Sequence, residues 1–442
     1  AMAAAQLRLL LCSPVPLPAV RGLSSVVSAA DLRRSKRGSR RPKDSVAAAA
    51  SAGEKSLLRV KRRTRSASEF DSEAYAQSLA EQRELGSGGG EDGVAHVPVM
   101  LGEVLRVFGH RRLRSFVDCT AGAGGHSSAI IRAHPELQLY VGVDVDPAAL
   151  ELARARVDVA MGNMMPHATK VEECRLRAYM HRGNFKSLKS ILGGIDGLLP
   201  LGDGDGVDGT IDGILMDLGM SSMQVNNPEK GFSVLEDGPL DMRMNPQAAL
   251  KADDILNSWP EAEVGRIFRE YGEESNWRLL QKKIVNARVL GGLHSTKELV
   301  DLVRTTSPKS RGRQGWMKTA IRVFQALRIA VNDELKTLED ALYACFDCLS
   351  SGGRLAVISF HSLEDRIVKQ TFLGIIERDE RGVELGEHSN GDCGTETEMW
   401  SKTKIGGKNG IILTKRPVTP SEEEEKLNYR CRSAKLRVIQ KI

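Results

Sequence analysis

The sequence of 442 residues has no apolar run of the roughly eighteen residues that a membrane-spanning helix requires. Its seven cysteines are scattered and odd in number, which argues against a secreted, disulfide-stabilised domain. The one close pair, Cys345 and Cys348, has no second Cys or His pair nearby and falls in a helical pattern, so it predicts packing instead of a zinc site. We therefore expect a soluble protein without a membrane span and without a catalytic metal.

Acidic residues are scarce in residues 1–66, where Asp31, Asp44 and Glu54 are the only ones among many Ala, Ser and Arg residues. This composition is typical of an organelle transit peptide, and a disordered basic arm that touches RNA non-specifically would share it. Residues 67–95 are polar, end in a Gly-rich run and are predicted to be a flexible linker. The net charge of +6 is only a mild bias toward anionic partners.

The stretch FVDCTAGAGGH (116–126) is the most informative part of the chain. An apolar strand ends at Asp118, and a turn containing Gly122, Gly124 and Gly125 follows, where the backbone can approach a nucleotide-like ligand closely. A second strand, LYVGVDVD, ends at Asp144, whose carboxylate suits the two hydroxyls of a ribose. Together these features predict a nucleoside-binding loop.

The acid at the end of the first strand favours one class of nucleoside. A dehydrogenase loop has the pattern G-x-G-x-x-G and brings a pyrophosphate to a helix N-terminus, where Asp118 would repel it. The same carboxylate could organise the loop around the ammonium group of S-adenosylmethionine, which carries no phosphate. The alternative is that Asp118 only caps the turn.

Strands and helices alternate along the chain, which predicts a parallel sheet with helices on both faces. Residues 228–320 read as helices and are predicted to be an inserted domain, followed by a long amphipathic helix over 321–349. Residues 158–174 read as a surface insertion and 377–408 as a disordered loop, and 410–415 and 434–442 read as a final antiparallel strand pair. We expect an α/β fold of the class I S-adenosylmethionine-dependent methyltransferase type: a Rossmann-like seven-stranded sheet (96–227 and 321–442) with an inserted helical domain for substrate recognition.

Several long motifs carry a family resemblance: HVPVMLGEV, CTAGAGGHS, MDLGMSSMQ, GFSVLEDGPLDMRMN, FQALRIAVNDEL, ISFHSLEDRIVK and RSAKLRVIQKI. From residue 96 to the end, apart from the two insertions, the chain resembles the bacterial ribosomal RNA small-subunit methyltransferase H family, also called MraW. The resemblance implies methyl transfer from S-adenosylmethionine to N4 of a cytidine in the decoding region of small-subunit rRNA. With the transit-like start, it implies an organellar member, in the chloroplast stroma or otherwise the mitochondrial matrix.

The resemblance also implies a set of cofactor contacts. They are Gly124, Gly125, His126, Asp144, Phe185, Asp217 and Gln224, to which the loop argument adds Asp118. Phe185 follows the third strand and could stack on adenine or pack in the core. Asp217 ends the fourth strand, at the edge where open α/β sheets place their ligands.

A cytosine amine is a poor nucleophile, so the reaction needs an acceptor for the amine and its proton. The Asn/Asp-Pro-Pro-Tyr/Phe loop of many amino-methylating enzymes is replaced here by Asp217-Leu-Gly-Met-Ser-Ser. Asp217, Asp241 and His361 are therefore the candidate catalytic residues, with helix capping as the alternative for His361.

Substrate RNA needs a basic surface. The candidates are Arg243 and the run Lys309, Arg311, Arg313 and Lys318, with Trp316 available to stack on a base. Solvated loop charge is the alternative for this run, and family members often have HPATRTFQ where this chain has KTAIRVFQ.

We expect small-subunit rRNA or the small ribosomal subunit as partner and leave a homodimer open. Two rival functions are a non-catalytic rRNA-binding assembly factor and an NAD-dependent dehydrogenase.

Overall fold

The computed structural model describes residues 70–84, 97–109, 112–163, 176–195, 209–306, 312–377 and 404–442. The predicted transit segment and most of the two predicted insertions lie outside these residues. Within them, no helix is long and apolar enough to cross a membrane.

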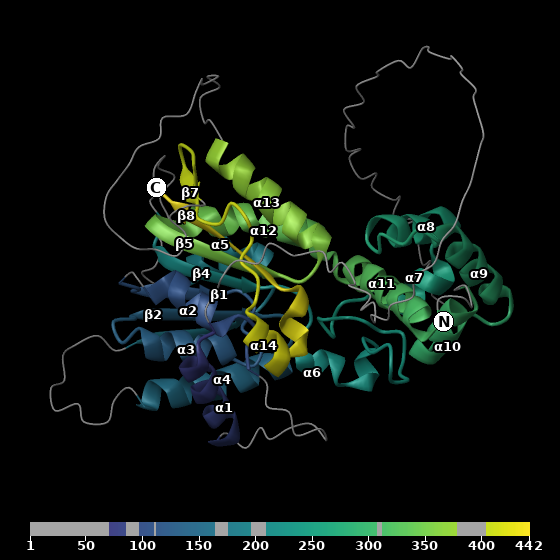
Figure 1. The fold of residues 1–442 in the computed structure, drawn as a ribbon, viewed down its shortest axis with the longest axis horizontal. Helices are drawn as coiled ribbons and strands as arrows, with labels where there is room; N and C mark the ends of the chain where they lie inside the picture. Colours follow the sequence, from purple (N-terminus) through teal and green to yellow (C-terminus); the bar gives the residue numbers. More distant parts are fainter. Residues whose placement is uncertain are drawn as a thin grey trace, which may run out of the picture. The chain divides into compact units, whose positions relative to one another are not determined.

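The described strands form one mixed sheet in the order β3-β2-β1-β4-β5-β8-β7-β6 (Figure 1). Five neighbouring strands are parallel: β1 (Ser115–Asp118), β2 (Leu139–Asp144), β3 (Arg177–Arg182), β4 (Ile211–Asp217) and β5 (Leu349–Ser359). The last strand, β8 (Lys435–Lys441), runs antiparallel to β5 and to β7 (Gly410–Ile412). This antiparallel end confirms the expected class I methyltransferase sheet.

The sheet has one strand more than predicted. The short strand β6 (Ile405–Gly406) pairs with β7 inside the segment 377–408 that was expected to be a disordered loop. The N–H of Gly407 donates to the carbonyl of Gly410 at 3.0 Å and closes a tight hairpin. Two extended residues beside a Gly-rich turn are too short a pattern to predict a strand from sequence.

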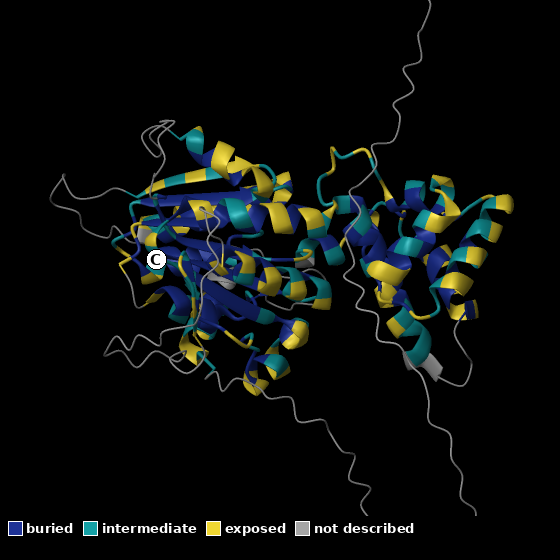
Figure 2. Cartoon of the chain, turned by 90° about the horizontal axis from the view of Figure 1, so that it is seen from above, coloured by how far each residue is buried: buried dark blue, intermediate teal, exposed yellow. Residues whose placement is uncertain are grey.

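Alternate side chains of each strand enter different cores, as the two-residue period of a strand requires. Phe116, Tyr140 and Leu215 pack on one face under α2 (Leu101–Gly109), α3 (Gly125–Ala133) and α4 (Pro147–Asn163). Their neighbours Val117 and Val141 pack on the other face under α5 (Leu188–Gly193), α12 (Glu334–Cys348) and α13 (Ser362–Glu377). Figure 2 shows the strands buried and the outer faces of the helices exposed.

A helical block with its own hydrophobic core separates β4 from β5 in the sequence. Its helices are α7 (Ala252–Ser258), α8 (Glu261–Glu270), α9 (Trp277–Val289), α10 (Thr296–Thr306) and α11 (Gly312–Asn332). Val323, Phe324 and Leu327 of α11 belong to this core, so the block continues to residue 332 and not to 320 as expected. Two short helices, α6 (Ser222–Val225) and α14 (Glu422–Leu427), complete the chain.

Two further expectations were wrong. The predicted linker contains the helix α1 (Ser72–Glu84), whose Tyr75 and Leu79 lie one turn apart and pack on Leu101 of α2. The single long helix predicted over 321–349 is two helices, because Asp333 adopts a left-handed conformation with φ of 47° between them. Aspartate tolerates this conformation better than most residues, so nothing in the apolar periodicity announces the break.

Candidate active site

Three aspartates end three adjacent parallel strands and so lie at one edge of the sheet. Asp118 ends β1, Asp144 ends β2 and Asp217 ends β4. β1 lies between the other two strands, with Asp118 in register with Gly142 on one side and Leu215 on the other. The carboxyl edge of a parallel sheet is where α/β folds bind their ligands, and these side chains define the candidate site there.

The glycine turn after β1 needs glycine for backbone and packing reasons. Gly122 and Gly124 have φ of 51° and 78°. A Cβ on Gly124 would lie 2.8 Å from Cα of Ala153 in α4, and one on Gly125 would lie 2.4 Å from Cγ of Pro98. The turn therefore has no room for side chains at these two positions, and only glycine allows its backbone to pack so closely against its neighbours.

Asp118 is the organiser of this turn. Its Oδ1 accepts a hydrogen bond from the N–H of Thr120 at 3.1 Å, and its Oδ2 accepts one from Oγ of Ser127 at 2.7 Å. The hydroxyl of Tyr140 donates to the same Ser127 oxygen at 2.7 Å. Burial raises the pKa of Asp118 to about 6, although these hydrogen bonds act to lower it. Asp118 is 1% exposed, and its carboxylate holds the loop through these hydrogen bonds. The bonds favour the alternative in which Asp118 caps the turn.

Asp144 connects the second strand to the same turn. Its Oδ2 accepts from the N–H of Gly122 at 2.8 Å and its Oδ1 from the N–H of Asp146 at 2.9 Å. These two bonds orient the carboxylate, and each oxygen keeps a second lone pair for a hydroxyl. The geometry therefore fits the expected ribose contact.

His126 faces Asp217 as a neutral ring. Its Nε2 lies 3.0 Å from the carbonyl oxygen of Val99, which can only accept, so Nε2 carries the proton and Nδ1 presents a lone pair. Burial lowers the pKa of His126 to about 4. The Nδ1 atom lies 3.8 Å from Oδ2 of Asp217. His126 and Asp217 were both expected to bind the cofactor. The fold brings them together, His126 from α3 and Asp217 from the end of β4.

Asp217 is the least satisfied of the three aspartates. The buried Oδ1 atom has no hydrogen-bond partner among the described residues, although the side chain as a whole is 24% exposed. Burial, then the charges of Asp118 and Glu364, raise the pKa of Asp217 to about 8. A cation placed here would supply the missing partner and favour the carboxylate. S-adenosylmethionine carries two cationic groups, so the residues present fit it.

The other two expected contacts have local structural roles as well. Gln224 is 5% exposed, and its Oε1 accepts from the N–H of Ser221 at 3.0 Å in the turn that begins α6. Phe185 begins a short 3-10 helix (Phe185–Ser187) after β3 and packs against the core under α12.

Asp241 and His361 are less suited to catalysis than the sequence suggested. Burial raises the pKa of Asp241, but the hydrogen bonds of Arg243, at 2.8 and 2.7 Å, outweigh it and hold the pKa below its usual range. Burial and then Arg328 lower the pKa of His361 to about 4, and its Nδ1 accepts from the N–H of Leu363 at 3.3 Å. Asp241 is thus an ion-pair partner, and His361 caps the start of α13.

Arg243 is a structural residue as well. Besides the fork onto Asp241, its Nη1 donates to the carbonyl oxygens of Pro246 and Ala248 at 3.1 and 2.7 Å. With four of its five N–H groups engaged, the guanidinium holds the loop before α7. The pattern DMRMN gave no sign of this, because the partner carbonyls come from the residues that follow it.

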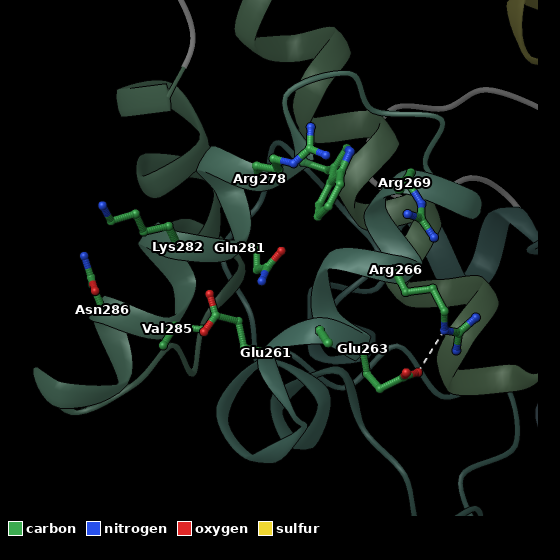
Figure 3. Close-up of a pocket in the computed structure, with 11 residues that line it drawn as sticks. Glu261, Glu263, Arg266, Arg269, Arg278, Gln281, Lys282, Val285 and Asn286 are labelled. Carbon is green, nitrogen blue, oxygen red and sulfur yellow. Dashed lines mark hydrogen bonds and ion pairs between the residues drawn. The ribbon is translucent and has the colours of Figure 1, made fainter. Parts of the chain in front are cut away.

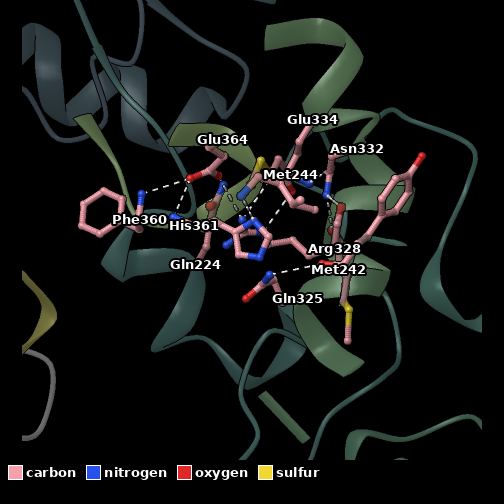
Figure 4. Close-up of polar contacts among 12 residues, drawn as sticks. Gln224, Met242, Met244, Gln325, Arg328, Asn332, Glu334, Phe360, His361 and Glu364 are labelled. Atoms are coloured by element: carbon pink, nitrogen blue, oxygen red, sulfur yellow. Dashed lines mark hydrogen bonds and ion pairs between the residues drawn. The ribbon is translucent and has the colours of Figure 1, made fainter. Parts of the chain in front are cut away.

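A buried ionic network that the sequence motifs did not predict lies beside the site (Figure 4). Arg328 of α11 donates to both oxygens of Glu334 at 2.9 Å, and its Nη2 lies 3.6 Å from Oε1 of Glu364. The other Glu364 oxygen accepts from the N–H groups of Phe360 and His361 at 3.0 and 2.9 Å. The network thus joins the helical block to the turn after β5. The signal was an arginine inside the apolar face of FQALRIAVNDEL.

The predicted basic run is only partly described. Lys309 and Arg311 lie outside the described residues, and of Arg313 only its place in α11 is described. Lys318 is exposed, while Trp316 packs on the block's core and lies under the guanidinium of Arg304, 4.3 Å from the ring centroid. That contact already covers the Trp316 ring with a cation.

The cysteine pair of α12 lies in the core. Cys345 and Cys348 are buried, and Sγ of Cys345 lies 4.0 Å from that of Cys119. No group of three or more His, Cys, Asp or Glu residues suited to a metal ion occurs in the part of the chain that the structure describes.

The strand order, the antiparallel last strand and the carboxylate-lined edge define a class I S-adenosylmethionine-dependent methyltransferase. Residues 93–442 match the family model described as "MraW methylase family". The chain belongs to the MraW methylase family and is a methyltransferase. This membership excludes the dehydrogenase reading.

Curated relatives agree over nearly their full length. The chain is 42% identical over 348 residues to "Ribosomal RNA small subunit methyltransferase H" of Heliobacterium mobile, covering 78% of this chain and 99% of the relative. It is 40% identical over 350 residues to the protein of the same name from Paenibacillus sp., again covering 78% and 99%. A solved structure described as a putative rRNA-methylase from Clostridium thermocellum matches 78% of this chain and 100% of its own at 11% identity and a TM-score of 0.30, too low to support any conclusion.

Proposed function

We propose that this methyltransferase modifies the exocyclic N4 of a cytidine in the decoding region of small-subunit rRNA, within an organelle. Two findings support the substrate. The curated relatives are named for small-subunit rRNA and align over nearly their entire length. The site also offers an acceptor suited to an amine, since Oδ1 of Asp217 is buried and has no hydrogen-bond partner in the part of the chain that the structure describes.

The unpartnered Oδ1 of Asp217 is the observation that carries the proposal. S-adenosylmethionine supplies an electrophilic methyl group on a sulfonium. The N4 lone pair forms the new N–C bond as the methyl–sulfur bond breaks, and N4 then loses a proton. Methylated N4 is cationic until that loss, and an ionised Asp217 accepts the proton. His126 lies with its Nδ1 atom 3.8 Å from Asp217 but is neutral, so it provides no positive charge to pair with the carboxylate.

A non-catalytic assembly factor would have no need for an unsatisfied carboxylate at the cofactor edge, because leaving a buried oxygen unpaired costs about 1–3 kcal/mol. We therefore place catalysis ahead of assembly alone.

The test uses the full chain with methyl-labelled S-adenosylmethionine and three substrates: small ribosomal subunits, bare small-subunit rRNA and transfer RNA. Digestion to nucleosides should give label in N4-methylcytidine from one of the first two. Asp217→Asn keeps the shape of the side chain and should abolish transfer. Label only in transfer RNA would refute the substrate, label in another nucleoside would refute the N4 position, and no transfer at all would restore the assembly-factor reading.

The organellar location rests on the acid-poor, Arg- and Ser-rich residues 1–66. Residues 1–66 fused to a fluorescent protein should direct it into isolated chloroplasts, with cleavage of the fusion. Import into mitochondria alone would indicate the mitochondrial matrix as the location of the protein. Exclusion from both organelles would refute an organellar location.

A further inference from the structure

A groove in the helical block gathers positive charge around an aromatic ring, and none of its residues belongs to the site described above (Figure 3). It lies between α8 and α9 and has a volume of about 810 Å³. Its cationic and aromatic lining residues are Arg266, Arg269, Trp277, Arg278 and Lys282. Two carboxylates, Glu261 and Glu263, also line it, so cations outnumber acids two to one.

The two helices meet closely enough to build this groove because of one glycine. A Cβ on Gly265 of α8 would lie 2.9 Å from Cζ3 of Trp277 and 2.2 Å from Oε1 of Gln281 on α9. The bare backbone of Gly265 therefore lets the Trp277 ring lie against α8. The ring in turn carries arginines from both helices: the Cζ of Arg278 lies 4.5 Å from its centroid and that of Arg269 lies 5.5 Å away. Such stacking holds the planar guanidinium groups in place.

The charges of the groove are not all neutralised within the protein. Arg266 and Arg269 share Glu270, at 3.2 and 2.7 Å, and Arg266 also bonds Glu263 at 2.8 Å. Arg278 and Lys282, both exposed, have no ion-pair partner among the described residues. They lie one turn apart on α9, where like charges repel and destabilise the helix slightly. An anion bound between them would relieve that repulsion.

We infer that this groove binds the phosphate backbone of the substrate RNA, as an anchor separate from the cytidine pocket. Arginines fixed by stacking suit phosphate, whose oxygens accept two parallel N–H bonds, and four cations on two helices suit a chain of repeated charges. The groove belongs to the block inserted between β4 and β5, the strands that lead to Asp217 and to the His361 turn. RNA held there is tethered to the same chain that carries the site. This inference rests on the proposed function for the identity of the RNA.

The test compares the wild type with the double variant Arg278→Gln/Lys282→Gln. The matched control, Lys297→Gln/Lys336→Gln, removes two exposed lysine charges from α10 and α12 outside the groove. The probe is a fluorescent 20-nucleotide oligouridylate, titrated by anisotropy across a salt series. Melting curves check that both variants are folded.

Each lost phosphate contact on a single strand makes the slope of log affinity against log salt shallower by about 0.7. Relative to 1 M salt, two lost contacts therefore weaken binding at 0.1 M salt by about 1.4 logarithmic units, or roughly 25-fold. The control should match the wild type. In methylation of small-subunit rRNA, the groove variant should raise KM for the RNA and leave kcat unchanged, because no groove residue touches the reacting atoms.

Failure of the anchor and failure of the proposed function give different results. If the wild type methylates rRNA while the groove variant keeps its affinity and salt slope, the anchor is refuted, the function stands, and an acidic protein becomes the expected occupant. If the wild type methylates no rRNA while the groove variant alone loses oligouridylate binding, the function is refuted and the anchor stands. Equal losses in the groove variant and the control would refute the anchor, since general charge would then explain both.

Discussion

Cofactor binding should release a proton from Asp217. With a pKa of about 8, Asp217 is about nine-tenths protonated at pH 7 before the cofactor binds. A sulfonium or ammonium beside the carboxylate favours the ionised form, so cofactor binding lowers the pKa of Asp217. Up to about 0.9 proton should therefore leave Asp217 for each cofactor bound at pH 7.

The pKa of Asp217 also sets the free-energy cost of ionising this side chain when the cofactor binds. Ionising Asp217 one pH unit below its pKa costs about 1.4 kcal/mol, which is a factor of ten in affinity. Affinity for S-adenosylmethionine should thus rise about tenfold between pH 6 and 7 and level off above pH 8. Neutral His126, whose pKa is about 4, contributes nothing to this slope.

The assay is isothermal titration calorimetry of the full chain with S-adenosylmethionine at pH 7, in buffers of different ionisation enthalpy. The dependence of the observed enthalpy on the buffer gives the number of protons exchanged. Asp217→Asn cannot ionise, so the difference between wild type and variant isolates this side chain from the titrating amine of the ligand. Equal proton release in both proteins would refute the assignment of Asp217 as the group that meets the cofactor's charge.

Three other variants test the site and its supports. Gly124→Ala should destabilise the fold by about 1–3 kcal/mol in urea unfolding, because it adds a Cβ at 2.8 Å from Ala153 on a backbone with φ of 78°; an unchanged midpoint would contradict this packing. Asp144→Ala should weaken S-adenosylmethionine binding by about 100-fold or more, since two hydrogen bonds to a charged group contribute about 1.5–3 kcal/mol each; unaltered affinity by calorimetry would show that the ribose lies elsewhere. Arg328→Met leaves the buried Glu364 and the partly buried Glu334 without their cation and should cost about 3–5 kcal/mol at pH 7, whereas the double variant Arg328→Met/Glu334→Leu should recover part of that loss in the same unfolding assay.

The sheet could be predicted from sequence because its signals are local. Four of the five parallel strands contain an apolar run that ends in an aspartate or serine, the polar edge strand β3 being the exception. Neighbouring side chains along these strands alternate between two cores, as the two-residue period demands. The break at Asp333 and the helix α1 escaped the same reasoning. One depends on a single left-handed residue inside an unbroken apolar pattern, and the other on two apolar side chains, Tyr75 and Leu79, in a polar segment.

The site residues that were misjudged owe their roles to partners distant in sequence or to backbone groups. The motif DMRMN shows an acid and a base two residues apart, and only the fold reveals that Arg243 also binds two carbonyl groups. The groove between α8 and α9 escaped for the same reason. Its arginines come from two helices, and Trp277 of α9 stacks with arginines of both. In the sequence, Trp277 indicates only an aromatic residue packed in the core.

Asp118 and Asp217 show where a pattern stops being informative. Both end a parallel strand at the same edge, both are followed by a turn, and burial raises the pKa of both. Asp118 receives hydrogen bonds on both oxygens from its own loop, which hold its pKa to about 6. Asp217 has a buried oxygen without a partner among the described residues, and its pKa rises to about 8. Because the hydrogen bonds to Asp118 already stabilise its charge, Asp217 is the one of the two able to respond to a bound cation and then to take a proton.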